Sequence, residues 1–585
     1  MLDYYGLMSR PKRLITLALA AACACCPVLG ATPLLESPNN SNLDGELFYQ
    51  LLISEISVRA GDNGSAYGLM LNAARKANSP LLYERAVEIA LRARSGDAAL
   101  DAAKAWAHAF PSSVQANRFQ LQILLGMNKI AETQEPLKRE LASLAPAERA
   151  TAISQLPRYF SRTTDKKLAA SVLEKTLATE LPNRVTGPSA WAAIGALRLQ
   201  AEDADSALDA AQRGAALNPV AEEPVLLATA LIRPKAPAAE AMVRNYLARK
   251  PTSDVRMAYA RSLINAQRFA EAYAQAQALT QEKPDFADAW LMRGSLELQD
   301  AKLSSAESSL STFLALNPPT DDTASGAAMS RGLVQAYLLL AQVAEQGQKL
   351  DNAIAYLQKI DSPVDALRVQ RRYAAILARQ GKLDEGRMVI RAVPELQPSD
   401  ALEKINAEVQ LLRENRQYAA AYEMLREAVV KYPDETELVY DQAMLAEKMG
   451  KPDEMESLLR KVMLAKPDYH HAYNALGYSL ADRNVRLPEA RQLIDKALAY
   501  APNDPFIIDS LAWVEFRSGN PAEALRLLTG AFKARPDAEI AAHLGEVLWA
   551  SGQRDQAAAI WKEGIALNPN NETLLETIRR LRGNL

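Results

Sequence analysis

Apolar and small side chains recur at helical spacing along nearly the whole chain, starting at Leu47 and Phe48. Spacings of three and four residues place such positions on one face of an amphipathic helix. Short polar turns with glycine or proline interrupt this pattern at regular distances, as at Gly519-Asn520-Pro521. Glycine commonly follows the end of a helix and proline commonly opens the next one. The pattern therefore predicts a long series of helix pairs joined by tight turns.

The stretch 470–570 contains three copies of one pattern. Each copy has a leucine followed by a small residue, then an alanine, then a closing proline, and the closing prolines lie 34 and 33 residues apart. The aligned positions are Leu476-Gly477, Leu511-Ala512 and Leu544-Gly545, then Ala490, Ala524 and Ala557, and finally Pro502, Pro536 and Pro569. This period with small residues at fixed positions resembles the tetratricopeptide (TPR) repeat.

The resemblance covers roughly residues 47–580. It implies an all-α fold, a right-handed superhelical solenoid of about fourteen TPR helix-turn-helix repeats. We expect an N-terminal array at 45–318, a polar insertion or hinge at 319–330, a C-terminal array at 331–571 and a capping helix at 572–585. A polar terminal helix is what a solenoid needs at its free end.

The N-terminus has the features of a secretory signal peptide. Basic residues precede an apolar run that ends in small residues near Gly30, so residues 1–30 are predicted to be removed, and 31–44 to form a flexible leader. Cleavage there leaves a chain without cysteine, which suits an oxidising compartment. The stretch before Cys23 also resembles a lipobox, although its leucine lies one residue too far upstream. Lipidation of Cys23 and an uncleaved anchor remain alternatives.

Composition and motifs argue against enzyme activity and against binding of nucleic acid, cofactors or metals. The chain of 585 residues has 67 basic and 70 acidic side chains, so no positive field attracts nucleic acid. No phosphate-binding glycine loop and no hydrolase or metalloprotease motif occurs. His108 and His543 fit packed helices, and His470-His471 has no second ligand pair at zinc spacing. We predict no enzyme activity, cofactor or metal, and membrane contact only through a lipid anchor.

Binding is the remaining role, and the C-terminal repeats carry the candidate surface. In TPR proteins the first helix of each pair lines the concave groove, which is knowledge of the family. Aromatic and arginine side chains concentrate binding energy in grooves. Packing between repeats is the alternative role for Trp513 and Trp549. The candidate groove residues are His471, Asn474, Tyr478, Asp482, Phe506, Asp509, Trp513, Phe516, Arg517, Glu546 and Trp549.

At a finer level, 51–93, 474–483 and 541–561 resemble secreted or lipid-anchored bacterial TPR proteins. One member of that group is the lipoprotein adaptor of a periplasmic carboxy-terminal processing protease. The resemblance implies a protein-binding scaffold in the cell envelope, periplasmic or anchored to the outer membrane. Its partners would be other proteins, including such a protease and its substrates. The alternatives are a structural component of an outer-membrane, pilus or polysaccharide-export assembly and, more remotely, a polysaccharide-binding solenoid.

Overall fold

The computed structural model describes residues 43–232, 237–318 and 329–582, and these residues contain helices and no strand. The predicted signal peptide, Cys23 and nearly all of the leader lie outside the described residues. The chain divides into two compact units, Met1–Lys250 and Pro251–Leu585. The predicted insertion at 319–330 also falls almost entirely outside the described residues, so the hinge stays a prediction.

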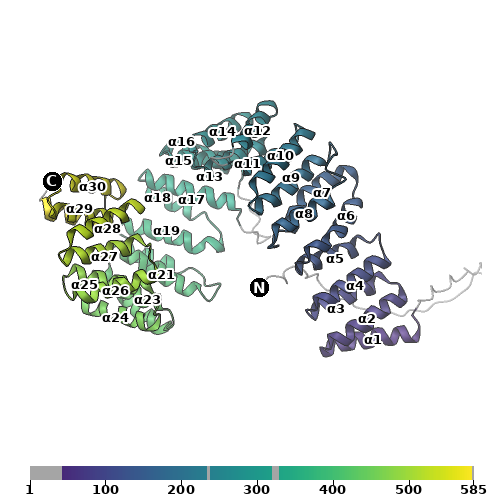
Figure 1. The fold of residues 1–585 in the computed structure, drawn as a ribbon, viewed down its shortest axis with the longest axis horizontal. Coiled ribbons are helices and arrows are strands. Elements are labelled where there is room, and N and C mark those ends of the chain that lie inside the picture. Colours follow the sequence, from purple (N-terminus) through teal and green to yellow (C-terminus); the bar gives the residue numbers. More distant parts are fainter. Residues whose placement is uncertain (1–42, 233–236, 319–328, 583–585) are drawn as a thin grey trace, which may run out of the picture. The chain divides into compact units, whose positions relative to one another are not determined.

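The first unit contains twelve α-helices and one 3-10 helix among its described residues (Figure 1). They are α1 (Gly45–Ala60), α2 (Asn63–Ala77), α3 (Pro80–Arg92), α4 (Gly96–Ala109), α5 (Val114–Gly126), η1 (Ile130–Thr133), α6 (Gln134–Ala142), α7 (Pro146–Tyr159), α8 (Lys166–Thr176), α9 (Gly187–Gln200), α10 (Ala204–Leu217), α11 (Glu223–Ala230) and α12 (Pro237–Arg249).

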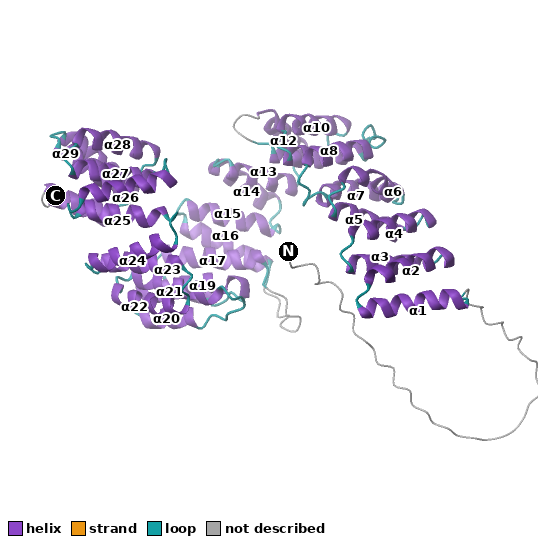
Figure 2. Cartoon of the chain, turned by 60° about the horizontal axis from the view of Figure 1, so that its bottom comes forward, coloured by secondary structure: helices purple, strands orange, loops and turns teal. Residues whose placement is uncertain are grey.

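The described residues of the second unit show the same succession of helices (Figure 2). Its helices are α13 (Ser253–Asn265), α14 (Phe269–Glu282), α15 (Ala287–Gln299), α16 (Leu303–Leu316), α17 (Arg331–Gln346), α18 (Leu350–Leu357), η2 (Pro363–Asp365), α19 (Ala366–Arg379), α20 (Leu383–Arg391), α21 (Asp400–Glu414), α22 (Tyr418–Lys431), α23 (Thr436–Lys448), α24 (Pro452–Ala465), α25 (His470–Asp482), α26 (Leu487–Tyr500), α27 (Pro505–Arg517), α28 (Pro521–Ala534), α29 (Ala538–Ala550), α30 (Arg554–Leu567) and α31 (Glu572–Arg582).

The turn chemistry expected from the sequence is confirmed between α26 and α28. The Asp504 carboxylate accepts hydrogen bonds from the amides of Phe506 (2.8 Å) and Ile507 (3.3 Å), so it caps α27. Pro505 occupies the first turn, where its missing N–H leaves no bond unmade. At the other end Gly519 adopts φ of 86°, a left-handed conformation that glycine takes without strain.

The small positions of the repeat are contact points between paired helices. A Cβ at Gly477 would lie 2.6 Å from Cγ1 of Ile494 on the partner helix α26. One at Gly545 would overlap the indole of Trp561 on α30. Ala490, Ala524 and Ala557 are completely buried. These positions set the distance between the two helices of each pair. The described residues form helices and no strand, which confirms the all-helical solenoid expected from the repeats.

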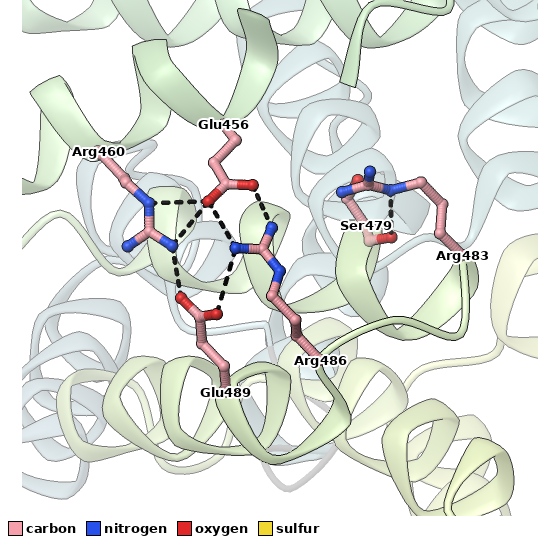
Figure 3. A network of polar contacts seen from close by, with 6 residues as sticks. All are labelled: Glu456, Arg460, Ser479, Arg483, Arg486 and Glu489. Carbon is pink, nitrogen blue, oxygen red and sulfur yellow. Dashed lines mark hydrogen bonds and ion pairs between the residues drawn. The ribbon is translucent and has the colours of Figure 1, made fainter. Parts of the chain in front are cut away.

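Neighbouring second helices are joined by charge as well as by packing. Glu456 on α24 pairs with Arg460 on its own helix and with Arg486 at the start of α26, while Glu489 bridges both arginines (Figure 3). Hydrogen bonds from Arg486 and then Arg460 outweigh the effect of burial and lower the pKa of Glu456 to about 2. The network holds the turn at Arg486, a residue with φ of 48°.

Candidate functional site

The eleven candidate groove residues all lie on α25, α27 and α29, the first helices of three consecutive repeats. We call this set of residues the aromatic surface. These helices belong to one continuous hydrophobic core that runs through the C-terminal repeats. The residues therefore lie on first helices of the repeats, while their place on a concave face and their role in binding stay predictions.

A buried polar cluster lies at the centre of the aromatic surface. His543 on α29 has its Nδ1 2.8 Å from Oδ2 of Asp509 on α27, and its Nε2 3.1 Å from the hydroxyl of Tyr478 on α25. The ring also stacks on Trp513, with centroids 4.5 Å apart. Tyr478 therefore reaches across the intervening helix α27 to α29. Side chains of alternate helices can meet in this way only where the surface curves inward.

Electrostatics favour the protonated form of His543 beside the Asp509 carboxylate. Burial alone would lower the pKa of His543, but the attraction of the Asp509 carboxylate and its hydrogen bond raise the pKa above the ordinary value. Burial is the main reason why the pKa of Tyr478 is also raised, so its hydroxyl stays protonated. His543 is 2% exposed, so its pair with Asp509 lies in the packed interior between α27 and α29.

Several candidate residues are engaged within the chain. Trp513 is 3% exposed and donates from Nε1 to Oδ1 of Asp482 at 3.3 Å. Arg517 donates to the carbonyl oxygens of Ala481 and Asp482. Glu546 is buried and pairs with Arg580 of the terminal helix at 2.5 Å. These side chains join neighbouring repeats. A partner that bound through them would have to break those contacts.

The accessible part of the aromatic surface lies at its edges. His471 is exposed, and its ring lies beside Tyr440 and Tyr469, while Phe516 is half-buried against Trp513. Trp549 is half-buried, with guanidinium groups of Arg554 and Arg582 over its ring at 5.0 and 6.0 Å. Half-exposed aromatic rings next to arginines are typical anchors for a protein partner.

Asn474 adds a polar group to this surface. Its Oδ1 is buried and accepts no hydrogen bond within the described part of the chain. A buried acceptor without a donor is costly in the folded protein.

Two carboxylates that the sequence did not single out also face this surface. Glu447 on α23 and Glu539 on α29 make no ion pair through their side chains within the described ranges. Burial raises the pKa of both carboxyl groups, and each feels the repulsion of neighbouring acids. Repulsion from Asp482 acts on Glu447, and repulsion from Asp509 acts on Glu539.

Neither metal binding nor membrane spanning finds support in the described ranges. No group of three or more histidine, cysteine, aspartate or glutamate side chains there could hold a metal ion. Across the same ranges, every helix is too short or too polar to cross a membrane.

Comparison with known proteins identifies the repeats. Models described as "Tetratricopeptide repeat" match residues 257–319, 334–362, 440–505 and 515–580. These four stretches of the chain are thus similar to tetratricopeptide repeats, in agreement with the helix pairs of the second unit. TPR proteins generally mediate protein–protein interactions.

Two curated relatives share parts of the chain. A "TPR repeat-containing protein" of Pseudomonas aeruginosa is 34% identical over 248 residues, which make up 42% of each protein. The human protein O-mannosyl-transferase TMTC1 is 26% identical over 172 residues, 28% of this chain and 19% of that one. The chain thus spans less than half the length of either relative.

Among solved structures, a tetratricopeptide repeat protein from Parabacteroides merdae matches with a TM-score of 0.31 and 15% identity, covering 51% of this chain and 99% of that one. The Cut9-Hcn1 hetero-tetramer of the APC/C matches with a TM-score of 0.27 and 12% identity, covering 92% and 96%.

Proposed function

We propose that this protein is a non-catalytic adaptor of the bacterial cell envelope. It holds segments of partner proteins against the aromatic surface and presents them to a periplasmic protease. The observation that carries the binding role is the surface of α25, α27 and α29, where the ring of His471 is exposed and the rings of Phe516 and Trp549 are half-buried. The envelope location rests on the signal-like N-terminus. The protease partner rests on the resemblance of 51–93, 474–483 and 541–561 alone.

The test of binding must spare the side chains that hold the repeats together. We expect His471→Ala combined with Phe516→Ala to reduce recovery of partners from envelope extract at least several-fold. A matched control is Tyr500→Ala combined with Leu567→Ala, which removes apolar surface from exposed positions on α26 and α30. Thermal melting of each variant shows whether it remains folded. Equal recovery by wild type and by the folded double variant would contradict the assignment.

Location and partner are separate questions. The intact mass of the mature protein distinguishes a free N-terminus at Ala31 from an acylated Cys23, and a cytoplasmic full-length chain would contradict both forms of the proposal. Cross-linking in the envelope followed by mass spectrometry identifies the bound proteins. Recovery of a protease supports presentation. Recovery of one fixed stoichiometric complex of outer-membrane, pilus or export components would instead favour the structural alternative.

A further inference from the structure

Helix α1 carries large apolar side chains on a face that no described helix covers. It is the outermost helix of the first unit (Figure 2). Its buried face, with Leu47, Ser54 and Val58, is the one that packs against α2. The opposite face carries four apolar side chains that are between 46% and 61% exposed: Phe48, Tyr49, Leu52 and Ile56. Their spacing of three and four residues makes one continuous stripe along the helix, which we call the α1 stripe.

The helix at the other end of the described chain has the opposite character. Apart from Leu575, the exposed positions of α31 are all charged: Glu572, Glu576, Arg579, Arg580 and Arg582. Such a polar outer face keeps the end of a solenoid soluble. A helix that is apolar on both faces is normally buried on both, and a contiguous exposed apolar patch marks an interaction site. The α1 stripe is therefore a surface that another element covers.

The two ends of α1 differ in charge. At the N-terminal end two carboxylates, Asp44 and Glu46, share the ammonium group of Lys76 at 3.0 and 2.7 Å. Two acids against one base leave this end with an excess of negative charge.

The C-terminal end of α1 carries Arg59, which borders the α1 stripe. Arg59 is exposed and makes no ion pair or hydrogen bond with any residue that the structure describes. Glu55 feels Arg59 electrostatically, but its carboxylate is already held by Arg85 through two hydrogen bonds of 2.8 and 2.9 Å. Asp62 in the next turn caps α2 through the amide of Ser65. The guanidinium group of Arg59 is thus available to a carboxylate outside the chain.

We propose that the α1 stripe is the interface of a homodimer, in which α1 of one chain packs antiparallel to α1 of a second copy. Full overlap of the two helices brings Glu46 of one copy beside Arg59 of the other, and Tyr49 beside Ile56. Leu52 then lies near the two-fold axis and meets Leu52 of the second copy. A two-fold symmetric interface requires a patch that is complementary to itself in this way. A parallel pair would instead bring like charges together and align the two helix dipoles.

The area of the α1 stripe fits a weak, reversible dimer. Covering the four side chains on both copies removes roughly 1,000 Å² from water, near the lower limit for a specific interface. We therefore expect the dimer to dissociate on dilution. Because the interface lies on the first unit, it depends neither on the aromatic surface nor on the envelope location.

Sedimentation equilibrium of the full-length protein over a range of concentrations measures the dissociation constant of the dimer. Leu52→Glu should raise this constant about tenfold or more, because it places two carboxylates against each other near the two-fold axis. Val430→Glu on α22 is the matched control, since it also changes an exposed apolar residue to a carboxylate, but in the second unit. It should leave the constant unchanged. Thermal melting shows that both variants fold.

Exchange of the end charges identifies the occupant as a second copy. Arg59→Glu alone should weaken the dimer several-fold, because it brings like charges together at both ends of the interface. Combining it with Glu46→Arg should restore the affinity, because each exchanged charge then meets its exchanged counterpart on the other copy. Three results would each overturn the proposal: wild type that is monomeric at every concentration, a dimer that Leu52→Glu does not weaken, or no recovery in the exchanged variant. A monomeric wild type would assign the α1 stripe to a different occupant, either the N-terminal residues of the same chain or another protein.

Discussion

The aromatic surface and a cavity of about 510 Å³ between α17, α19 and α21 occupy equivalent parts of the same repeat and differ in what fills the space between first helices. In α25, α27 and α29 the space is taken by Tyr478, Trp513 and His543, which bind one another. In α17, α19 and α21 it is left open, and the arginines of α19 are held by carboxylates. One framework thus supports a filled surface and an open one. The side chains that the first helices direct toward one another determine whether the space between those helices is filled or open.

The largest expected effect tests whether the aromatic surface is filled by its own side chains. Trp513→Ala should lower the free energy of unfolding by about 3–5 kcal/mol, because it removes a buried ring and leaves a cavity. Denaturant unfolding followed by far-ultraviolet circular dichroism measures the loss. Phe516→Ala, at a half-buried position, is the control and should cost clearly less. A loss below about 1 kcal/mol for Trp513→Ala would mean that this indole contributes little to packing.

The ion pair at the centre of the same surface should make stability depend on pH. The pKa of His543 is raised in the folded state above its ordinary value of 6.5, so the protonated ring stabilises the fold. The stabilisation is complete below that ordinary value and is lost as pH rises through the raised folded value. His543→Gln should cost about 3 kcal/mol at low pH, because Asp509 loses its charged partner.

Unfolding of wild type and His543→Gln across a pH series measures this dependence. The difference between the two proteins should shrink as pH rises. The groups that face the ring are Asp509, Tyr478, Glu539 and Glu546. A difference that does not change with pH would show that His543 is neutral in the folded protein.

A smaller effect is expected at the small positions where paired helices touch. Gly545→Ala should destabilise the fold by about 2 kcal/mol, because its Cβ would overlap Trp561 and force the helices apart. Gly530→Ala on α28 is the matched control, since nothing lies within 4 Å of its Cβ. That variant should gain up to about 1 kcal/mol from helix propensity. Equal effects of the two variants would mean that α29 and α30 can repack freely.

The smallest effect concerns the cavity. Arg372→Gln should cost about 1 kcal/mol, because it breaks the partly buried pair with Glu345 and the bond to the Leu338 carbonyl. Arg371→Gln should change stability by less than about 0.5 kcal/mol, because this side chain has no partner in the described residues. Denaturant unfolding compares the two variants. A larger loss for Arg371→Gln would indicate an internal role for that arginine.

Prediction from the sequence succeeded where the determining contacts are local. The cap by Asp504, the helix start at Pro505 and the left-handed turn at Gly519 depend on neighbours a few residues away. The small positions also follow from the period, because each contacts the other helix of its own pair. His543 was predicted to be a packed residue, which its burial confirms, although its ion pair with Asp509 was not foreseen.

The site was harder to predict because its contacts are distant. The sequence placed Trp513 and Glu546 on a candidate binding wall, and the structure shows both engaged within the chain, which leaves their part in binding a prediction. The sequence pattern does not predict the cavity between α17, α19 and α21. Its one sequence signal is the group Arg368, Arg371 and Arg372, which share one helix face but look like a solvated surface when α17 and α21 are not considered.

By itself, the sequence determined the repeat, its helix pairs and the small residues that bring paired helices together. These features recur with a fixed period and depend on short-range contacts, so they can be recognised without knowing the curvature. Only the tertiary structure decided which first-helix side chains meet. Tyr478 and His543 are 65 residues apart and touch because three successive repeats turn inward. That turn accumulates from many small packing angles, and no single stretch of sequence encodes it.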